Sequence, residues 1–212
     1  MSNHEEVLNF KNKDDKLVQT LKYIWESSVF VSQAFYQMPH ITAYIGIGSN
    51  LGTPEENCTK AIEKISSTKD IKIISKSSFY RTEPIGGVQQ GWFVNSTIEI
   101  ETDLSPENLL SVLLSLELAM GRIRKEKWGP RLIDLDLLLY GNLVLEKKGL
   151  TLPHPEIQNR KFVLTPMSEI AENLIHPTLK KTIKTLLQES SDVTIVKKIK
   201  KPNLNYRDQL FP

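Results

Sequence analysis

Two aspartates stand two positions apart in WGPRLIDLDLLLY, residues 128–140. The run is apolar and follows a Gly-Pro pair, so we expect it to form a β-strand, in which successive side chains point to opposite faces. Asp134 and Asp136 would then share one face, with their Cα atoms about 6.5–7 Å apart. The other face would carry apolar side chains only: Ile133, Leu135, Leu137 and Leu139. Carboxylates this close repel each other unless a proton or cation lies between them, and Mg²⁺ is the natural cation for such oxygens.

Positive charges come directly before the acidic pair: Arg122, Arg124, Lys125, Lys127 and Arg131. A carboxylate-bound metal can bridge phosphate oxygens, and arginines can neutralise the charge that moves toward a leaving group. Together these residues predict a polyphosphate site, with Gly121 and Gly129 allowing the basic segment to close as a lid. Each part alone has a plainer interpretation. The aspartates could lie on the solvated face of an edge strand, and the basic run could be a solvated loop or a nucleic-acid patch.

Composition limits the class of protein. With 212 residues, 40% of them hydrophobic, the chain has enough apolar material for one globular domain with an appendage. A formal net charge of +2 gives no support for a nucleic-acid partner. The single cysteine, Cys58, excludes an internal disulfide and fits a reducing compartment. No apolar stretch reaches the roughly 18 residues of a membrane span, and no targeting signal is evident. We therefore expect a cytoplasmic protein without a membrane partner.

The elements expected between residues 42 and 140 follow the order β-α-β-β-α-β. Strands are predicted over 42–48, 71–80, 92–102 and 132–141, and helices over 54–66 and 106–120. Thr53 and Ser105 are candidate N-caps, each followed by proline, and Glu56 would complete a capping box with Thr53. Beyond these, helices are expected near 161–171 and 178–189, with a terminal strand within 193–200.

This order predicts an α+β fold with a ferredoxin-like, mainly antiparallel sheet and helices packed on it in a three-layer α/β/α arrangement. A doubly wound parallel sheet is disfavoured because the second and third strands lack a crossover helix. We expect an N-terminal extension over 1–40 containing a helix, a catalytic domain over 41–200 and a tail over 201–212. The extension could dock on the domain or mediate self-association, or Met38 could be the true start of the chain.

The sequence also resembles a known family in several blocks. WGPRLIDLDLLLYG is similar to the signature of the 6-hydroxymethyl-7,8-dihydropterin pyrophosphokinases of folate biosynthesis. IGIGSNLG, FYRTEPIG, GWFVN, LELAMGRIR and LPHPEIQNRKFVL resemble that family's other blocks in the same order, over roughly residues 42–200. The resemblance implies transfer of pyrophosphate from ATP, as co-substrate, to the hydroxymethyl group of the dihydropterin, with release of AMP.

The resemblance also implies a set of site residues. Asp134 and Asp136 would bind two Mg²⁺ ions and, with Arg122 and Arg131, form the catalytic group. The residues expected to contact ATP are Glu117, Arg122, Arg124, Trp128, Arg131, Leu137, His154 and Arg160. Those expected to contact the pterin are Gly48, Asn50, Thr82, Glu83, Ile85, Phe93, Asn95 and Phe162.

Physical chemistry supports several of these expectations. Phe93 and Phe162 suit a flat heterocycle held between rings, and the Asn95 amide can match a donor–acceptor edge. Around Gly48 the spacing is G-x-G-x-x-x-G rather than the dinucleotide fingerprint, so we expect this turn near the pterin rather than around a phosphate. No general base is evident.

Two other classes remain open from the sequence. A four-stranded sheet of this kind also serves RNA-binding modules, although the aromatic RNP pattern is absent. The second class is a non-catalytic, structural relative of the pyrophosphokinases.

Overall fold

The structure is a computed structural model that describes residues 40–84, 90–122 and 129–200. The described residues form one compact unit. The N-terminal extension and the tail 201–212 lie outside the described residues, apart from His40. The helix and the self-association expected of the extension, and the domain boundaries, therefore stay predictions. None of the described helices is long and apolar enough to cross a membrane.

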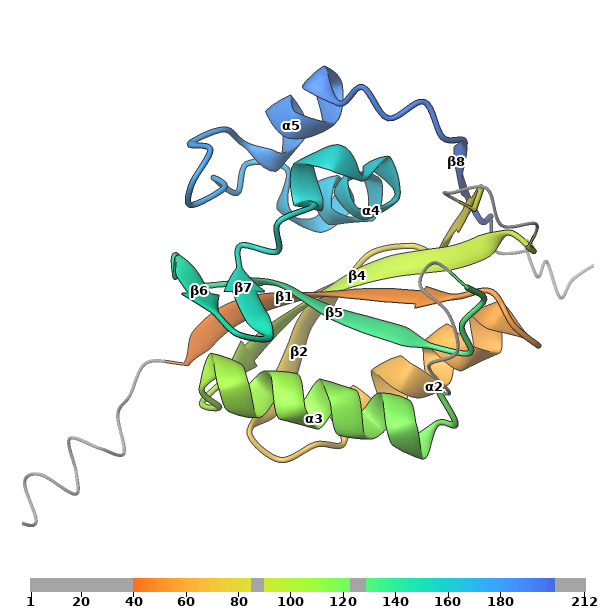
Figure 1. The fold of residues 1–212 in the computed structure, drawn as a ribbon, viewed down its shortest axis with the longest axis horizontal. Coiled ribbons are helices and arrows are strands. Elements are labelled where there is room, and N and C mark those ends of the chain that lie inside the picture. The colour runs from red at the N-terminus through yellow and green to blue at the C-terminus, as the bar shows by residue number, and fades with distance from the viewer. Residues whose placement is uncertain (1–39, 85–89, 123–128, 201–212) are drawn as a thin grey trace, which may run out of the picture. The chain divides into compact units, whose positions relative to one another are not determined.

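An antiparallel sheet lies at the centre of this unit (Figure 1). Its strands are β1 (Ile41–Ser49), β2 (Ile71–Lys76), β3 (Tyr80–Thr82), β4 (Phe93–Thr102), β5 (Asp134–Tyr140) and β8 (Val196–Lys198). They are ordered β5-β1-β4-β3-β8, and β2 also pairs with β4. Every pairing is antiparallel, which confirms the predicted type of sheet.

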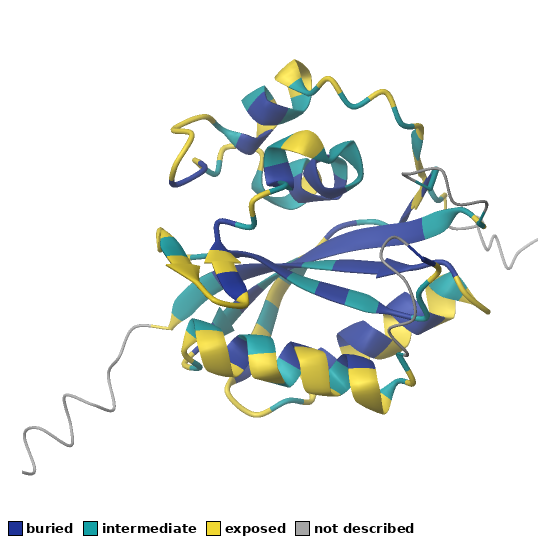
Figure 2. Ribbon diagram, viewed as in Figure 1, coloured by how far each residue is buried: buried dark blue, intermediate teal, exposed yellow. Residues whose placement is uncertain are grey.

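Helices cover both faces of the sheet (Figure 1). One face carries α2 (Pro54–Ser66) and α3 (Pro106–Ala119), and the other carries α4 (Lys161–Ala171) and α5 (Ile183–Glu189). A separate hairpin of β6 (Leu145–Lys147) and β7 (Leu150–Leu152) precedes the short 3₁₀ helix η1 (Ile157–Asn159). Each helical layer closes its own cluster of buried side chains, and Figure 2 shows the central strands largely buried between them.

A bulge changes the faces of β5 after the acidic pair. Leu137 lies opposite Ile45 and Leu139 opposite Tyr44, so Leu138 is the extra residue. Leu137 packs in the core under α2 and α3, whereas Leu138 and Leu139 both join the cluster under α4 and α5. The expectation that Leu139 shares a face with Leu135 and Leu137 is therefore wrong, because strict alternation stops at the bulge.

The helix starts agree with the prediction in part. The Ser105 hydroxyl accepts from Asn108 N and caps α3 as expected. The capping box at Thr53 is wrong, since its hydroxyl donates to Glu56 Oε2 and accepts no backbone N–H.

Two other boundaries also differ. The segment expected as one strand over 71–80 divides into β2 and β3 at Ser77–Phe79, where the Ser77 hydroxyl accepts from Thr97 N. The helix expected from 178 begins at Ile183, because His176 Nδ1 accepts from Thr178 N and Leu179 N and holds a turn there. The β6–β7 hairpin was not predicted.

Candidate active site

The sheet places polar side chains in two rows. Pairing of β5 with β1 sets Asp134 opposite Gly48 and Asp136 opposite Gly46. Pairing of β1 with β4 sets those glycines opposite Asn95 and Thr97. Each carboxylate on β5 is thus separated from a polar residue on β4 by a glycine, which has no side chain to fill the space.

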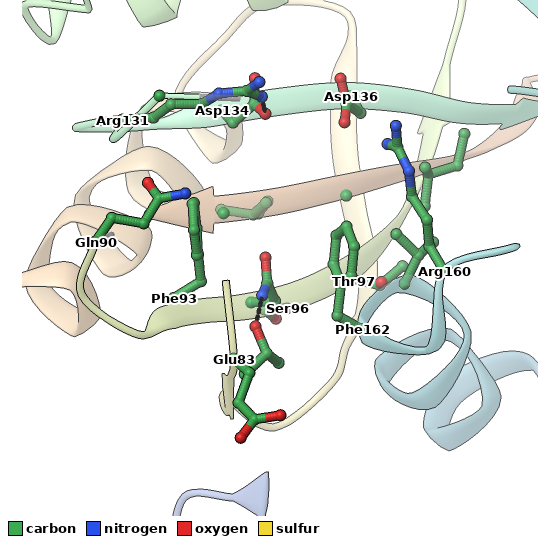
Figure 3. Close-up of a pocket in the computed structure, with 18 residues that line it drawn as sticks. Glu83, Gln90, Phe93, Ser96, Thr97, Arg131, Asp134, Asp136, Arg160 and Phe162 are labelled. Carbon is green, nitrogen blue, oxygen red and sulfur yellow. Dashed lines mark hydrogen bonds and ion pairs between the residues drawn. The ribbon is translucent and has the colours of Figure 1, made fainter. Parts of the chain in front are cut away.

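The two aspartates have different surroundings. Asp134 Oδ1 pairs with Arg122 Nη2 at 2.7 Å, and Asp134 Oδ2 pairs with Arg131 Nη1. The Asp136 carboxylate has no hydrogen bond or ion pair within the described residues, and Figure 3 shows Arg160 extending toward it. Burial, followed by the charge of Asp134, raises the pKa of Asp136 to about 6. A further positive charge beside Asp136 would therefore stabilise this pair of carboxylates.

Glu117 supports the pair from α3. Its side chain is buried, and Oε1 accepts from Leu135 N at 2.7 Å, within β5. The same oxygen pairs with Arg122, which in turn pairs with Asp134. Burial raises the pKa of Glu117, although the Leu135 N–H and Arg122 oppose that shift. The carboxylate thereby joins α3 to β5 and orients one of the predicted catalytic arginines.

A first cavity opens between the sheet and α4 (Figure 3). Phe93 and Phe162 lie on opposite sides of it. Six of the eight residues expected at the pterin contribute to its lining: Gly48, Thr82, Glu83, Phe93, Asn95 and Phe162. Arg160, expected at ATP, lines this cavity too, with its guanidinium carbon 5.8 Å from the Phe162 ring centroid.

The polar wall of the first cavity has a fixed orientation. Asn95 Nδ2 donates to Thr82 Oγ1 at 2.7 Å, which leaves Asn95 Oδ1 as an acceptor. A Cβ on Gly48 would come within 2.8 Å of that oxygen, so glycine is needed there to make room for the amide. The Glu83 carboxylate is used elsewhere: it accepts from Ile195 N at 3.0 Å.

A second cavity lies against α3 and the β6–β7 hairpin. Glu117, Arg122, Arg131, Leu137 and His154, all expected at ATP, contribute to its lining. His154 Nδ1 accepts from Glu156 N, so in the neutral ring Nε2 carries the proton and can donate. Burial, followed by the charge of Arg160, lowers the pKa of His154 and keeps that neutral form. Asp134 and Asp136 line both cavities, together with Gly129 and Arg131.

Asn50 is placed differently from the other residues expected at the pterin. It is not among the residues that line the first cavity, and its amide joins three segments instead. Asn50 Oδ1 accepts from Arg131 N at 2.7 Å, while Nδ2 donates to Gln90 Oε1 and Gly91 O. Its place in the structure is that of a bridge between the end of β1, Arg131 and the segment before β4.

Three expected site residues, Ile85, Arg124 and Trp128, lie outside the described residues. Other residues line the first cavity without having been expected: Gly46, Ile47, Gln90, Ser96, Thr97, Leu138 and Val163. A usable signal existed for Thr97, since it follows Asn95 by two positions on the same strand.

Comparison with known proteins gives a consistent result. Residues 44–172 match the family model described as 7,8-dihydro-6-hydroxymethylpterin-pyrophosphokinase (HPPK). The chain is 42% identical over 157 residues to a 2-amino-4-hydroxy-6-hydroxymethyldihydropteridine pyrophosphokinase of Haemophilus influenzae, covering 74% of this chain and 98% of that protein. It is 43% identical over 133 residues to the protein of the same name from Methylorubrum extorquens, covering 63% and 84%.

Solved structures show the same fold. A structure described as HPPK-DHPS in complex with substrates superposes with a TM-score of 0.57 at 15% identity, covering 71% of this chain. The match spans 43% of that longer chain. A Plasmodium falciparum HPPK-DHPS gives a TM-score of 0.53 at 16% identity, covering 70% of this chain and 43% of that one. The family model spans more than half of the sequence, and the chain belongs to the 7,8-dihydro-6-hydroxymethylpterin-pyrophosphokinase family.

Proposed function

We propose that this protein transfers the pyrophosphoryl group of ATP to 6-hydroxymethyl-7,8-dihydropterin, with Mg²⁺, and so serves folate biosynthesis. The observation that carries the proposal is the meeting of the two cavities at Asp134 and Asp136. A transfer enzyme must hold its donor and its acceptor close together and aligned, and two cavities that meet at one charged centre allow this. Family membership identifies the donor and acceptor.

The second cavity suits the triphosphate. Arg122 and Arg131 bring two permanent positive charges to the acidic pair, and His154 adds a neutral donor. These groups can hold phosphate oxygens and neutralise charge that develops toward AMP. Arg160 reaches the same centre from the first cavity (Figure 3).

The first cavity suits the pterin. Phe93 and Phe162 can hold a flat ring between them and exclude water, while Asn95 Oδ1 can accept from its polar edge. With the ring so placed, the hydroxymethyl group can reach the side of the cavity formed by Asp134 and Asp136. Positioning of this kind can account for much of the catalysis, because a loose phosphoryl transfer needs no strong base.

The acidic pair fits magnesium. Its donor atoms are carboxylate oxygens, and the Asp136 carboxylate has no hydrogen bond or ion pair within the described residues. Those residues hold no group of three or more His, Cys, Asp or Glu side chains suited to a metal. Magnesium commonly binds through one or two carboxylates and takes its other ligands from phosphates and water, so two aspartates suffice. When bound, the expected two ions would supply positive charge to the transferring group.

We also infer that the fold is ferredoxin-like, with three layers. The four main strands follow the spatial order β5-β1-β4-β2, and helices lie on both faces. That order matches the β-α-β-β-α-β connection predicted from the sequence.

The test is an assay for AMP with ATP, Mg²⁺ and 6-hydroxymethyl-7,8-dihydropterin. Wild-type protein should release AMP only when the dihydropterin is present. Asp136→Asn should lower turnover at least about 100-fold, because the metal loses an anionic ligand. The free energy of unfolding should stay equal or rise, since a buried charge is removed.

Asp103→Asn is the matched control, because Asp103 is half-exposed and pairs with His40 away from both cavities. It should keep wild-type turnover. Folded wild-type protein that releases no AMP would falsify the proposed function, and an active Asp136→Asn protein would contradict the metal assignment alone.

A further inference from the structure

One polar group in the first cavity has no role in the site described so far. Thr97 is fully buried, and its hydroxyl has no hydrogen-bond partner among the described residues. The residue lines the first cavity beside Ser96 and Phe162. Buried hydroxyls are normally paired, because an unpaired one loses its hydration without compensation.

The backbone of Thr97 does not account for the choice of residue. Thr97 N donates to Ser77 Oγ at 3.0 Å, and Thr97 O accepts from Ser77 N at 2.9 Å. Both bonds would survive replacement of the side chain. Apolar packing does not require a hydroxyl either. Gly46 of β1 pairs with Thr97, and the apolar side chain of Leu138 lies over that glycine. Valine has the same shape and would pack there without an unpaired oxygen.

The location of Thr97 indicates what it could contact. It follows Asn95 by two positions on β4, so the two side chains share the face that lines the cavity, about 6.5–7 Å apart along the strand. Asn95 offers Oδ1 as an acceptor, while one of its two Nδ2 hydrogens is donated to Thr82. The Thr97 hydroxyl can donate as well as accept, so the wall offers two different polar contacts to one edge of a flat ligand.

We propose that Thr97 is a specificity-determining residue, whose hydroxyl hydrogen-bonds a polar atom on the ring edge of the flat heterocyclic acceptor next to the contact of Asn95. The proposal rests on the proposed function, which places the dihydropterin in this cavity. A heterocycle that meets only Asn95 would leave the Thr97 hydroxyl unpaired and would bind more weakly.

The experiment compares Thr97→Val, which keeps the shape and removes the hydroxyl, with Thr97→Ser, which keeps the hydroxyl. Calorimetry measures the Kd of 6-hydroxymethyl-7,8-dihydropterin and, separately, of a non-hydrolysable ATP analogue with Mg²⁺. Thr97→Val should weaken dihydropterin binding about fivefold to tenfold. Thr97→Ser should stay within about twofold of wild type. Binding of the ATP analogue should change in neither variant.

Chemical unfolding separates this effect from a structural one. Thr97→Val should be at least as stable as wild type, since an apolar group replaces an unpaired hydroxyl. If Thr97→Val does not fold, Thr97→Ala and Thr97→Ser form the comparison, because they differ in the hydroxyl alone. Dihydropterin binding that is equal with and without the hydroxyl overturns the proposal. Wild-type protein that binds no dihydropterin overturns the proposed function instead.

Discussion

Glu117 shows how a buried residue can control a site through its neighbours. It accepts the Leu135 N–H and pairs with Arg122, which holds Asp134 Oδ1 at 2.7 Å. Burial raises the pKa of Glu117, and both partners oppose that rise, so each contact favours the charged carboxylate. Loss of the carboxylate should therefore affect Arg122 and Asp134 before it affects the rest of the fold.

We predict that Glu117→Gln lowers kcat/KM about tenfold, because the amide can still accept from Leu135 N but no longer balances the charge of Arg122. Glu117→Ala should in addition lower the free energy of unfolding by about 3 kcal/mol, since a buried pair loses one partner. Steady-state kinetics and chemical unfolding check the two effects. Glu107→Gln is the control, because Glu107 lies on the same helix, exposed and paired with Lys147. Equal effects of the Gln and Ala variants on turnover and stability would contradict this account.

At the scale of single residues, local alternation predicted the shared face of Asp134 and Asp136, whereas Glu117 was expected at the site only through the family resemblance. Asp134 and Asp136 share a face because strands alternate, and the alternation is local. The burial of Glu117 depends on which side of a leucine-rich helix meets β5, which the spacing of its leucines does not decide. Thr97 could have been found from Asn95 by the same alternation, but its missing partner is visible only in the folded chain.

At the scale of elements, most helices and strands followed from local patterns, and the exceptions depended on contacts across the sheet. The bulge at Leu138 arises from pairing with β1. The sequence gives no sign of it, because residues 137–139 are all leucine. The division of β2 from β3 depends on Ser77, whose hydroxyl bonds Thr97 N of another strand. Such features require the partner strand to be in place before they can be recognised.

The stabilisation from one set of hydrogen bonds between elements should depend on pH. Glu169 of α4 accepts from Ser78 N, Ser78 Oγ, the Tyr80 hydroxyl and Lys198 Nζ, all at 2.8–2.9 Å, and so joins α4 to β3 and β8. Burial alone would raise its pKa, but these hydrogen bonds outweigh burial and lower the pKa to about 2. Because the folded pKa lies below the unfolded value of about 4.3, the stabilisation is complete above that value and is lost as the pH falls toward 2.

We predict that Glu169→Gln reduces the slope of the free energy of unfolding against pH between about pH 5 and pH 2. At pH 7 the variant should be less stable by about 1–2 kcal/mol, because charge-assisted hydrogen bonds become neutral ones. Chemical unfolding over a pH series measures both. Glu172→Gln, at an exposed pair with Lys184, should leave the slope unchanged. A wild-type slope in Glu169→Gln would show that this carboxylate does not carry the acid sensitivity.

At the scale of the whole molecule, residues from His40 onward should carry the activity by themselves. Both buried clusters are built from described residues between Ala43 and Ile199, and both cavities are lined from that stretch. We predict that a chain starting at His40 unfolds cooperatively and keeps kcat and KM within about twofold of the full chain. Turnover, chemical unfolding and the number of subunits in solution are measured for both chains. Matching values would exclude a functional docking or self-association by the N-terminal extension. Fewer subunits together with lost turnover would instead show that the extension assembles an active oligomer, because the described site is otherwise the same in both chains.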